Sequence, residues 1–342
     1  MTMNEQQNSE DPPPFVIPVP HSSQHSTSSI HDTIVPGQDP DIALDNGRTW
    51  NLGHEPWPKP VEGKLLLDEL AAVYKKFVVL PEWAPEALAL WTVHTHASHL
   101  REATAYLGIE YPQKPSRKAR LLDVLGALVN RPVVSSHIRS RELLRLVDER
   151  RPTLLIDEID NLLSGNDELR GLVNSDRRRS SAFVIRIANA PEITTASKPS
   201  AVIRSLPPVL APGLTLFSSW CPKAMAAISR LPEMFAERCI LIRMRRKTRK
   251  DHCEPVRNLA HYANSLRRKC ARFVLDCSHK IANARPEIPR DMNGRLGDAW
   301  EPLLPLADLA GEPWPGLARQ AARALAKKRR DNRGGKQIKS DL

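Results

Sequence analysis

The chain has 342 residues, and its 50 Lys and Arg against 39 Asp and Glu give a formal net charge of +11. No stretch approaches the roughly 18 consecutive apolar residues of a membrane span, and the N-terminus lacks the basic start and apolar core of a secretory signal. We therefore expect a soluble, cytoplasmic protein without a membrane partner. The five cysteines form no CxxC pair, which argues against a disulfide framework and against a cysteine-rich zinc site.

Composition divides the chain into a central part and two tails. Residues 1–62 hold ten of the thirty prolines and carry nine acidic against two basic residues. Apolar residues are scattered there without a period, so we expect a disordered, Pro-rich and Ser-rich acidic tail. Residues 326–342 are rich in Lys and Arg and form an expected basic tail.

The central part is expected to hold three units. Two helical patterns, the second beginning at Pro85, predict a helical lead-in at 63–104. In 105–248, short apolar strands alternate with amphipathic helices, an order that predicts an α/β fold with a parallel sheet covered by helices. Patterns in 249–325 are helical only, so we expect a helical lid domain there.

The second half of the core shows less regular alternation than the first. The run TLFSSW at 215–220 is expected to be a strand, and a helix is expected from Pro222 to Arg230. Further strands are expected in SAFVIRIA at 181–188 and ILIRMRRK at 240–247.

The sharpest local signal is TLLIDE, a buried-strand run that ends in Asp157 and Glu158. In P-loop ATPases an acidic residue at the end of such a strand holds Mg²⁺ through water, and a following Glu can polarise the attacking water. A strand that ends in exposed acids is the plain alternative. Asp160 adds a third carboxylate, so a metal-dependent nuclease is a further alternative.

Such a Walker B strand needs a phosphate-binding loop one or two strands earlier, within YPQKPSRKAR at 111–120. Here the chain resembles an uncharacterised family of P-loop ATPase-like domains in plasmid and prophage proteins, often at the end of primase or helicase polypeptides. The resemblance spans residues 63–325 and rests on ordered blocks that include WTVHTH, RLLDVLGALV, RPTLLIDEID, WCPKAMAAI, LPEMFAERCI and GDAWEPLLPLADLAG. It implies a P-loop NTPase fold of AAA+ or helicase-like type, with ATP and Mg²⁺ as cofactors.

Members of this family usually carry Cys-Gly-Lys-Thr where this chain has Ser116, Arg117, Lys118 and Ala119. The resemblance therefore implies that Lys118, with Ser116, binds phosphate in a degenerate Walker A loop. Arg117 lacks the backbone freedom with which Gly lets N–H groups approach phosphate, and Ala119 lacks the hydroxyl that ligates Mg²⁺. We expect impaired hydrolysis, although the basic loop can still attract an anion.

The same resemblance implies roles for residues further along the chain. TLFSSW would be the sensor strand, with Ser218 or Ser219 as its polar sensor. Arg238 would be an arginine finger that stabilises charge on a neighbour's γ-phosphate, and Arg295 the lid arginine that contacts the nucleotide. For each arginine, a surface residue or a helix-capping ion pair is the plain alternative. A retained Arg238 beside a degenerate phosphate loop leads to the hypothesis that this chain completes a partner's site.

Basic residues between the Walker B helix and the end of TLFSSW predict contacts with nucleic acid. They are Arg177, Arg178, Arg179, Lys198 and Arg204. In helicase-like relatives a hairpin at this position grips the nucleic acid backbone with little dependence on base sequence. A solvated basic edge is the plain alternative.

Three neighbouring histidines, His94, His96 and His99, suggest a metal site at first sight. On a helix His94 and His96 point about 200° apart, so only His96 and His99 share a face. No third ligand is evident, and we therefore expect packed or capped histidines.

The sequence thus predicts a P-loop ATPase or helicase-like protein of a mobile element, which couples ATP binding or hydrolysis to DNA replication or transfer. We expect a homo- or hetero-oligomer that binds DNA with low sequence specificity, with a primase or helicase as candidate partner. The alternative is a non-hydrolysing DNA-binding or scaffold subunit, which Arg117 and Ala119 favour.

Overall fold

The computed structural model describes most of the chain between residues 41 and 337. The described ranges are 41–43, 49–51, 55–112, 119–135, 140–159, 167–187, 214–228, 230–292 and 294–337. Among these residues, no helix is both long enough and apolar enough to cross a membrane.

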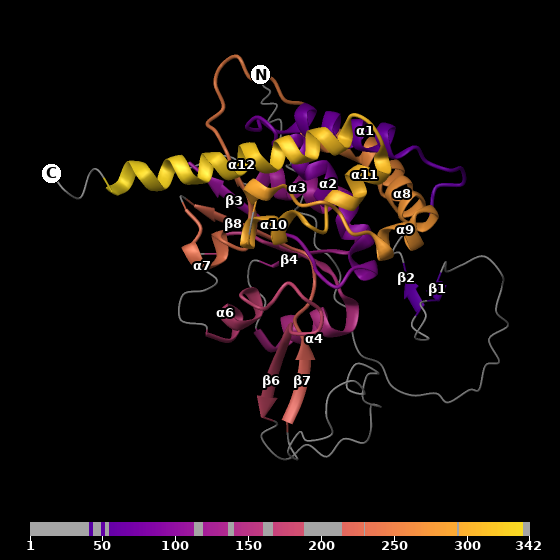
Figure 1. Ribbon diagram of the computed structural model, residues 1–342, viewed down its shortest axis with the longest axis vertical. Helices are drawn as coiled ribbons and strands as arrows, with labels where there is room; N and C mark the ends of the chain where they lie inside the picture. Colours follow the sequence, from indigo (N-terminus) through magenta and orange to yellow (C-terminus); the bar gives the residue numbers. More distant parts are fainter. Residues whose placement is uncertain are drawn as a thin grey trace, which may run out of the picture. The chain divides into compact units, whose positions relative to one another are not determined.

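A five-stranded parallel sheet forms the centre of the fold (Figure 1). Its central strands are buried along most of their length, which suits their nearly continuous apolar runs. Each neighbouring pair in the sheet is parallel, so the predicted parallel α/β sheet is confirmed. The strand order is β4 (Pro132–Ser135), β5 (Thr153–Ile156), β8 (Lys223–Ile228), β3 (Tyr106–Tyr111) and β9 (Cys239–Arg243).

Helices cover both faces of the sheet. After β3 the chain crosses to β4 at the far edge, and it then returns through β5 to β8. Because such crossovers are right-handed, connections that run in opposite directions fall on opposite faces. α3 (Ala119–Leu128) packs into the hydrophobic cluster on one face. The cluster on the other face contains α4 (Ser140–Arg150), α6 (Asp167–Val173) and α7 (Glu233–Ala236).

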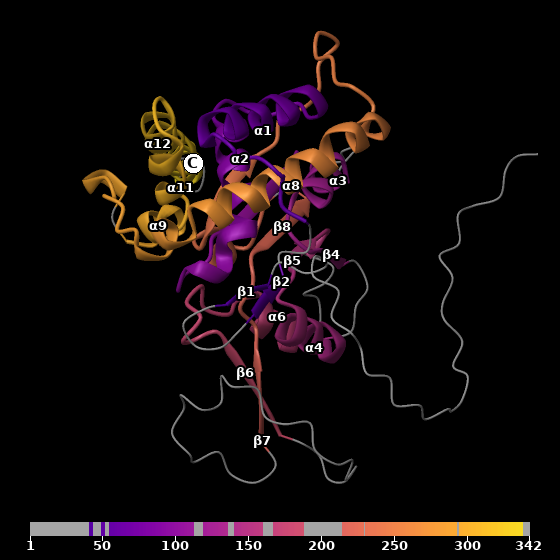
Figure 2. The same ribbon diagram turned by 90° about the vertical axis from the view of Figure 1, so that its right-hand side faces the viewer.

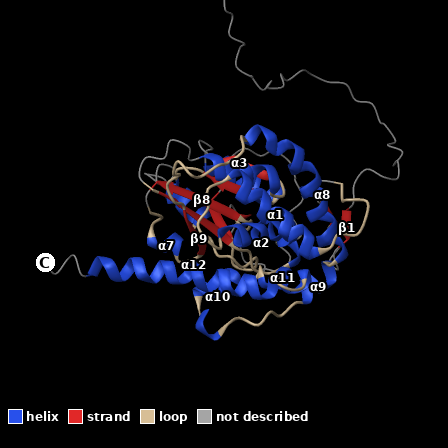
Figure 3. Ribbon diagram, turned by 90° about the horizontal axis from the view of Figure 1, so that it is seen from above, coloured by secondary structure: helices blue, strands red, loops and turns tan. Residues whose placement is uncertain are grey.

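The helices of the predicted lead-in and lid share one hydrophobic core with the α3 face of the sheet (Figure 3). Thirteen of the fourteen residues of α2 are buried, which explains why the apolar residues of this helix are not confined to one face. The Trp91 indole in α2 donates a hydrogen bond to the carbonyl of Ala105, just before β3. The predicted boundaries of lead-in, core and lid stay predictions. Besides α3, this layer contains α1 (Gly63–Phe77), α2 (Ala84–Ala97), α8 (Ala260–Asp276), α11 (Leu304–Ala310) and α12 (Trp314–Gln337).

TLFSSW does not belong to the central sheet, so its predicted place as the sensor strand of that sheet is wrong. Among the described residues, β6 (Phe183–Ile187) and β7 (Leu214–Ser218) pair with each other alone, in an antiparallel two-stranded sheet. Figures 1 and 2 show this pair extending beyond α4, away from the central sheet. The apolar pattern of TLFSSW predicted a strand correctly, but such a pattern does not identify the pairing partner.

β8 takes the expected place of TLFSSW, in a segment where the sequence predicts a helix. Its residues KAMAAI favour helices by intrinsic propensity, yet β8 lies between β3 and β5. Ala224 and Ala226 belong to the cluster on one face, whereas Met225 and Ala227 belong to the other. A strand buried on both faces needs no polar alternation, so tertiary packing overrides the local preference.

Shorter elements complete the described part of the chain. β1 (Asp41–Ala43) and β2 (Thr49–Asn51) pair in antiparallel fashion, within the tail 1–62 whose disorder stays a prediction. The remaining elements are η1 (Ser98–Leu100), η3 (Val256–Leu259), α9 (Ser278–Asn283), η4 (Arg290–Met292) and α10 (Arg295–Trp300).

Candidate functional site

The carboxyl ends of β3, β8 and β5 meet at one edge of the sheet. The connections after β3 and β8 leave towards opposite faces, since α3 and α7 belong to different hydrophobic clusters. In open α/β sheets, ligands bind in the crevice that forms at such a point. Because β8 separates β3 from β5, the ends of these two strands lie about 10 Å apart.

β5 brings Asp157 and Glu158 to this edge. All four residues of β5 are buried, whereas the two acids are half-buried. Asp157 Oδ1 accepts a hydrogen bond from the Glu158 N–H at 2.9 Å. Glu158 has a φ of 47°, in the left-handed region that residues other than glycine rarely adopt. Such conformations concentrate at functional sites, where the surrounding structure must hold them.

Two residues that the sequence interpretation missed lie near Asp157. Tyr111 ends β3, and Asp123 lies on α3. Burial raises the pKa of Tyr111, and the negative charges of Asp157 and Asp123 raise it further. Partial removal from water raises the pKa of Asp123, and the charge of Asp157 adds to this effect. The Tyr111 hydroxyl is buried and has no hydrogen-bond partner within the described ranges.

The available signal for Tyr111 and Asp123 was their position on either side of the predicted phosphate loop. Its residues Ser116, Arg117 and Lys118 lie outside the described residues. α3 begins at Ala119, directly after Lys118. The first N–H groups of a helix have no partners inside the helix, so this position favours a bound anion.

The carboxylates at this edge suit a hard cation that keeps part of its water. Mg²⁺ is usually held by one or two carboxylates together with waters and substrate phosphates. In the part of the chain that the structure describes, no group of three His, Cys, Asp or Glu side chains is arranged to hold a metal ion. A Mg²⁺ ion at Asp157 would therefore take further ligands from phosphate and water. Asp160, the third acid of the nuclease alternative, lies outside the described residues.

Three predicted site residues lie at the opposite edge of the sheet, where its strands begin. Ser219 precedes β8 and Arg238 directly precedes β9, while Arg295 forms an ion pair with Glu237. The strand register puts Asp157 four residues further along the strand direction than Arg238, which is about 13 Å. Ser219 and Arg295 therefore do not join Asp157 in one site of the same chain.

Two of the five residues predicted to contact nucleic acid make extensive contacts inside the chain. Arg177 pairs with Asp298 at 3.4 Å, and its side chain is only 12% exposed. Arg179 lies over the Trp220 ring and donates to two backbone carbonyls. These contacts give Arg177 and Arg179 a structural part, and their predicted grip on nucleic acid stays a prediction. Arg178 is exposed, and Lys198 and Arg204 lie outside the described residues.

The three histidines are packed inside the fold, as the sequence predicts. His94 Nε2 accepts a hydrogen bond from the Ala105 N–H at 3.0 Å, so this nitrogen carries no proton. His96 Nε2 donates to the carbonyl oxygen of Leu128 at 3.1 Å. Burial lowers the pKa of both His94 and His99 to about 3, which keeps the two rings neutral at physiological pH.

Comparison with known proteins finds partial matches. A family model described as "Protein of unknown function (DUF3631)" matches residues 243–342. The "Uncharacterized 28.9 kDa protein in xis 5'region" of Saccharopolyspora erythraea is 32% identical over 94 residues. These residues are 27% of this chain and 35% of that protein, so the chain spans about a third of the length of this curated relative.

One solved structure gives a weak match, "The A form apo structure of NrS-1 C terminal region-CTR". The alignment covers 66% of this chain and 51% of that chain, at 12% identity and a TM-score of 0.33. A TM-score this low carries no argument about fold or function.

Proposed function

We propose that this chain is a P-loop ATPase-like protein of AAA+ or helicase-like type that binds Mg–ATP at the edge formed by β3, β8 and β5. The observation that carries the proposal is the position of Asp157 and Glu158, separated by a single strand from the end of β3. In this proposal Lys118 holds phosphate at the start of α3. Asp157 binds Mg²⁺ through water, and Glu158 orients the attacking water.

Tyr111 supports a ligand at this edge. A buried hydroxyl without a partner costs about 1–3 kcal/mol, which a hydrogen bond to a ligand oxygen would offset. Tyr111 ends the strand that leads into the loop before α3, and its pKa responds to the charges of Asp123 and Asp157. Its hydroxyl is therefore a candidate donor to an oxygen of the bound nucleotide.

The second candidate function is a non-hydrolysing subunit that completes a partner's ATPase site. Ala119 favours it, because the first residue of α3 has no hydroxyl for Mg²⁺. Arg238 favours it as well, since it lies at the edge opposite to Asp157 and would reach a nucleotide on another chain more readily than its own.

The proposed setting is DNA replication or transfer in a mobile element, in an oligomer or beside a primase or helicase. The net charge of +11 supports a polyanionic partner. The relative named for the xis 5′ region agrees with the mobile-element setting. Both parts rest mainly on the sequence resemblance.

ATP hydrolysis with and without single-stranded DNA tests the proposal and separates its two forms. For the enzyme form we expect Mg²⁺-dependent turnover that Glu158→Gln abolishes and that the exposed control Glu312→Gln leaves unchanged. For the non-hydrolysing form we expect no turnover until Arg117→Gly and Ala119→Thr are combined. Absence of turnover and of ATP binding in the natural chain would contradict the enzyme form, and absence of turnover in the double variant would contradict the non-hydrolysing form.

A further inference from the structure

The loop between β9 and α8 carries a dense run of positive charge. Six of the eight residues 243–250 are Lys or Arg. Four of them are exposed and form no ion pair with any described residue: Arg246, Lys247, Arg249 and Lys250. Figure 2 shows this loop, in orange, rising beyond α1.

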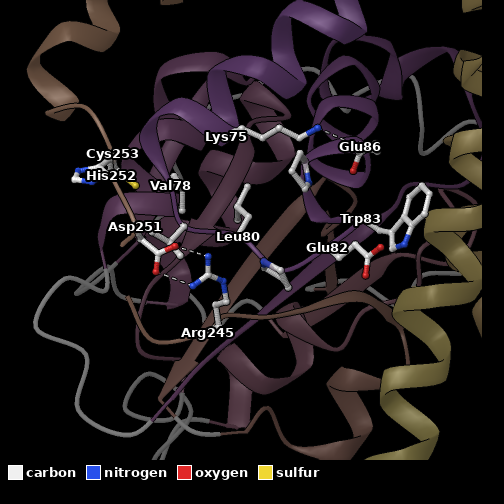
Figure 4. Close-up of a pocket in the computed structure, with 13 residues that line it drawn as sticks. Lys75, Val78, Leu80, Glu82, Trp83, Glu86, Arg245, Asp251, His252 and Cys253 are labelled. Atoms are coloured by element: carbon white, nitrogen blue, oxygen red, sulfur yellow. Dashed lines mark hydrogen bonds and ion pairs between the residues drawn. The ribbon is translucent and has the colours of Figure 1, made fainter. Parts of the chain in front are cut away.

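Asp251 orders the loop from within. Its carboxylate binds the Arg245 guanidinium through two hydrogen bonds of 2.6 and 2.8 Å (Figure 4). The same carboxylate accepts from the N–H and the hydroxyl of Thr248, at 2.7 and 2.8 Å. The Asp251 N–H donates back to the Thr248 carbonyl at 3.2 Å, which closes a turn over residues 248–251. One carboxylate thus neutralises Arg245 and fixes the turn that carries the other cations.

The base of the loop is attached to α1. The Glu254 N–H donates to the Lys76 carbonyl at 3.0 Å, and the two side chains form an ion pair at 3.1 Å. Arg245 and Asp251 also line a cavity of ≈ 410 Å³ between this base and the connection from α1 to α2 (Figure 4). The exposed cations therefore project from an anchored base.

We propose that the basic loop 245–251 binds the phosphodiester backbone of DNA. Four cations within five residues repel one another, and closely spaced phosphates relieve this repulsion while counterions are released. An anionic membrane surface fits less well, because the loop presents no apolar side chain for insertion. The inference rests on the proposed function only in naming DNA as the polyanion.

Two variants with the same net charge test the loop. The loop variant replaces Arg246, Lys247, Arg249 and Lys250 with Gln. The control variant replaces four other exposed cations with Gln, namely Lys59, Lys280, Arg285 and Arg290. Both changes are on the surface, so circular dichroism and thermal unfolding should match the natural chain. Binding of fluorescent duplex and single-stranded 30-mers is measured by anisotropy between 50 and 300 mM salt.

We expect the loop variant to bind at least about tenfold more weakly at 0.1 M salt. Each lost phosphate contact lowers the salt slope by about 0.9 for duplex and about 0.7 for single strands, so the slope should fall by about 3. Equal losses in the two variants, or unchanged binding by the loop variant, would overturn the proposal. Loss of binding only to vesicles with 25% phosphatidylserine would also overturn it. Nucleotide binding is measured on the same proteins, so failure of the loop proposal is distinguishable from failure of the proposed function.

Discussion

The carboxyl of Asp123 on α3 lies close enough to Asp157, after β5, for the charge of Asp157 to raise the pKa of Asp123. Asp123 lies on the helix that follows Lys118, whereas Asp157 follows β5. Like charges held together in this way are relieved by a cation, which is the electrostatic condition expected at a magnesium site. The relationship links the helix after the proposed phosphate loop to the end of β5.

Replacing Asp157 should change the titration of Asp123. We expect Asp157→Asn to lower the pKa of Asp123, because a nearby negative charge is removed. The pKa should stay above its ordinary value, since partial removal from water is the larger cause of the shift. Carboxyl ¹³C chemical shifts followed by NMR measure this, with Asp291→Asn as control. An unchanged Asp123 titration would show that the two acids are not coupled.

The buried histidines predict a loss of stability in mild acid. His94 and His99 have a pKa of about 3 in the folded chain, against about 6.5 when unfolded. Between these values the unfolded chain binds more protons, so stability is complete above pH 6.5 and falls as the pH falls towards 3. From pH 7 to pH 5, each histidine should lower the free energy of unfolding by roughly 2 kcal/mol.

Urea unfolding at several pH values measures this loss. His94→Gln should remove about half of the pH dependence, whereas the exposed control His261→Gln should leave it unchanged. The same pH dependence in His94→Gln as in the natural chain would contradict the assignment to His94.

We expect the side chain of Lys223 to contribute strongly to the free energy of unfolding. It is fully buried, and its ammonium donates to the Tyr106 hydroxyl, the Ser175 hydroxyl and the Ser219 carbonyl at 2.9 to 3.0 Å. Lys223→Ala leaves a cavity and removes all three bonds, so we expect a loss of about 2–4 kcal/mol. Lys280→Ala, at an exposed site, should change stability by less than about 0.5 kcal/mol in the same denaturant titration. A comparable effect of the two substitutions would contradict this account of Lys223.

Asp251→Asn separates loop order from net charge in DNA binding. The substitution removes a negative charge, so net charge alone predicts tighter binding. It also removes the ion pair with Arg245 that helps to fix the turn, so the basic-loop proposal predicts weaker binding. Anisotropy titrations at 0.1 M salt decide the sign, with Asp276→Asn as a control of equal charge. Equal or tighter binding by Asp251→Asn would show that the ordered turn is not needed.

The first half of the α/β core could be predicted from the sequence because local pattern and burial agree there. The apolar run before Asp157 and the amphipathic pattern of α3 each have one interpretation. β8 could not be predicted, because KAMAAI has the propensity of a helix and becomes a strand only between β3 and β5. Because β8 was expected to be a helix, TLFSSW was the strand-like run that remained for the sensor position.

For the site, Asp157 and Glu158 could be located from the sequence because these two carboxylates directly follow a recognisable apolar strand. The internal contacts of Arg177 with Asp298 and of Arg179 with Trp220 could not be predicted, because the partners are distant in sequence and only the fold brings them together. The positions of Tyr111 and Asp123 beside the predicted loop were visible in the sequence, but their proximity to Asp157 comes only from the fold. The run of positive charge at 243–250 can be recognised in the sequence. The turn that the Asp251 carboxylate fixes through Thr248 cannot be predicted from it.

Mg²⁺-dependent binding of ATP tests the central claim most directly. Titration calorimetry on the full chain, with and without Mg²⁺, would compare the natural protein with Asp157→Asn, Lys118→Ala and the exposed control Asp291→Asn. The account predicts binding that Mg²⁺ strengthens in the natural chain and in the control. It predicts loss of the Mg²⁺ effect in Asp157→Asn and weaker binding in Lys118→Ala. ATP binding that is absent in the natural chain, or unchanged by both substitutions, would contradict a nucleotide site at this edge of the sheet.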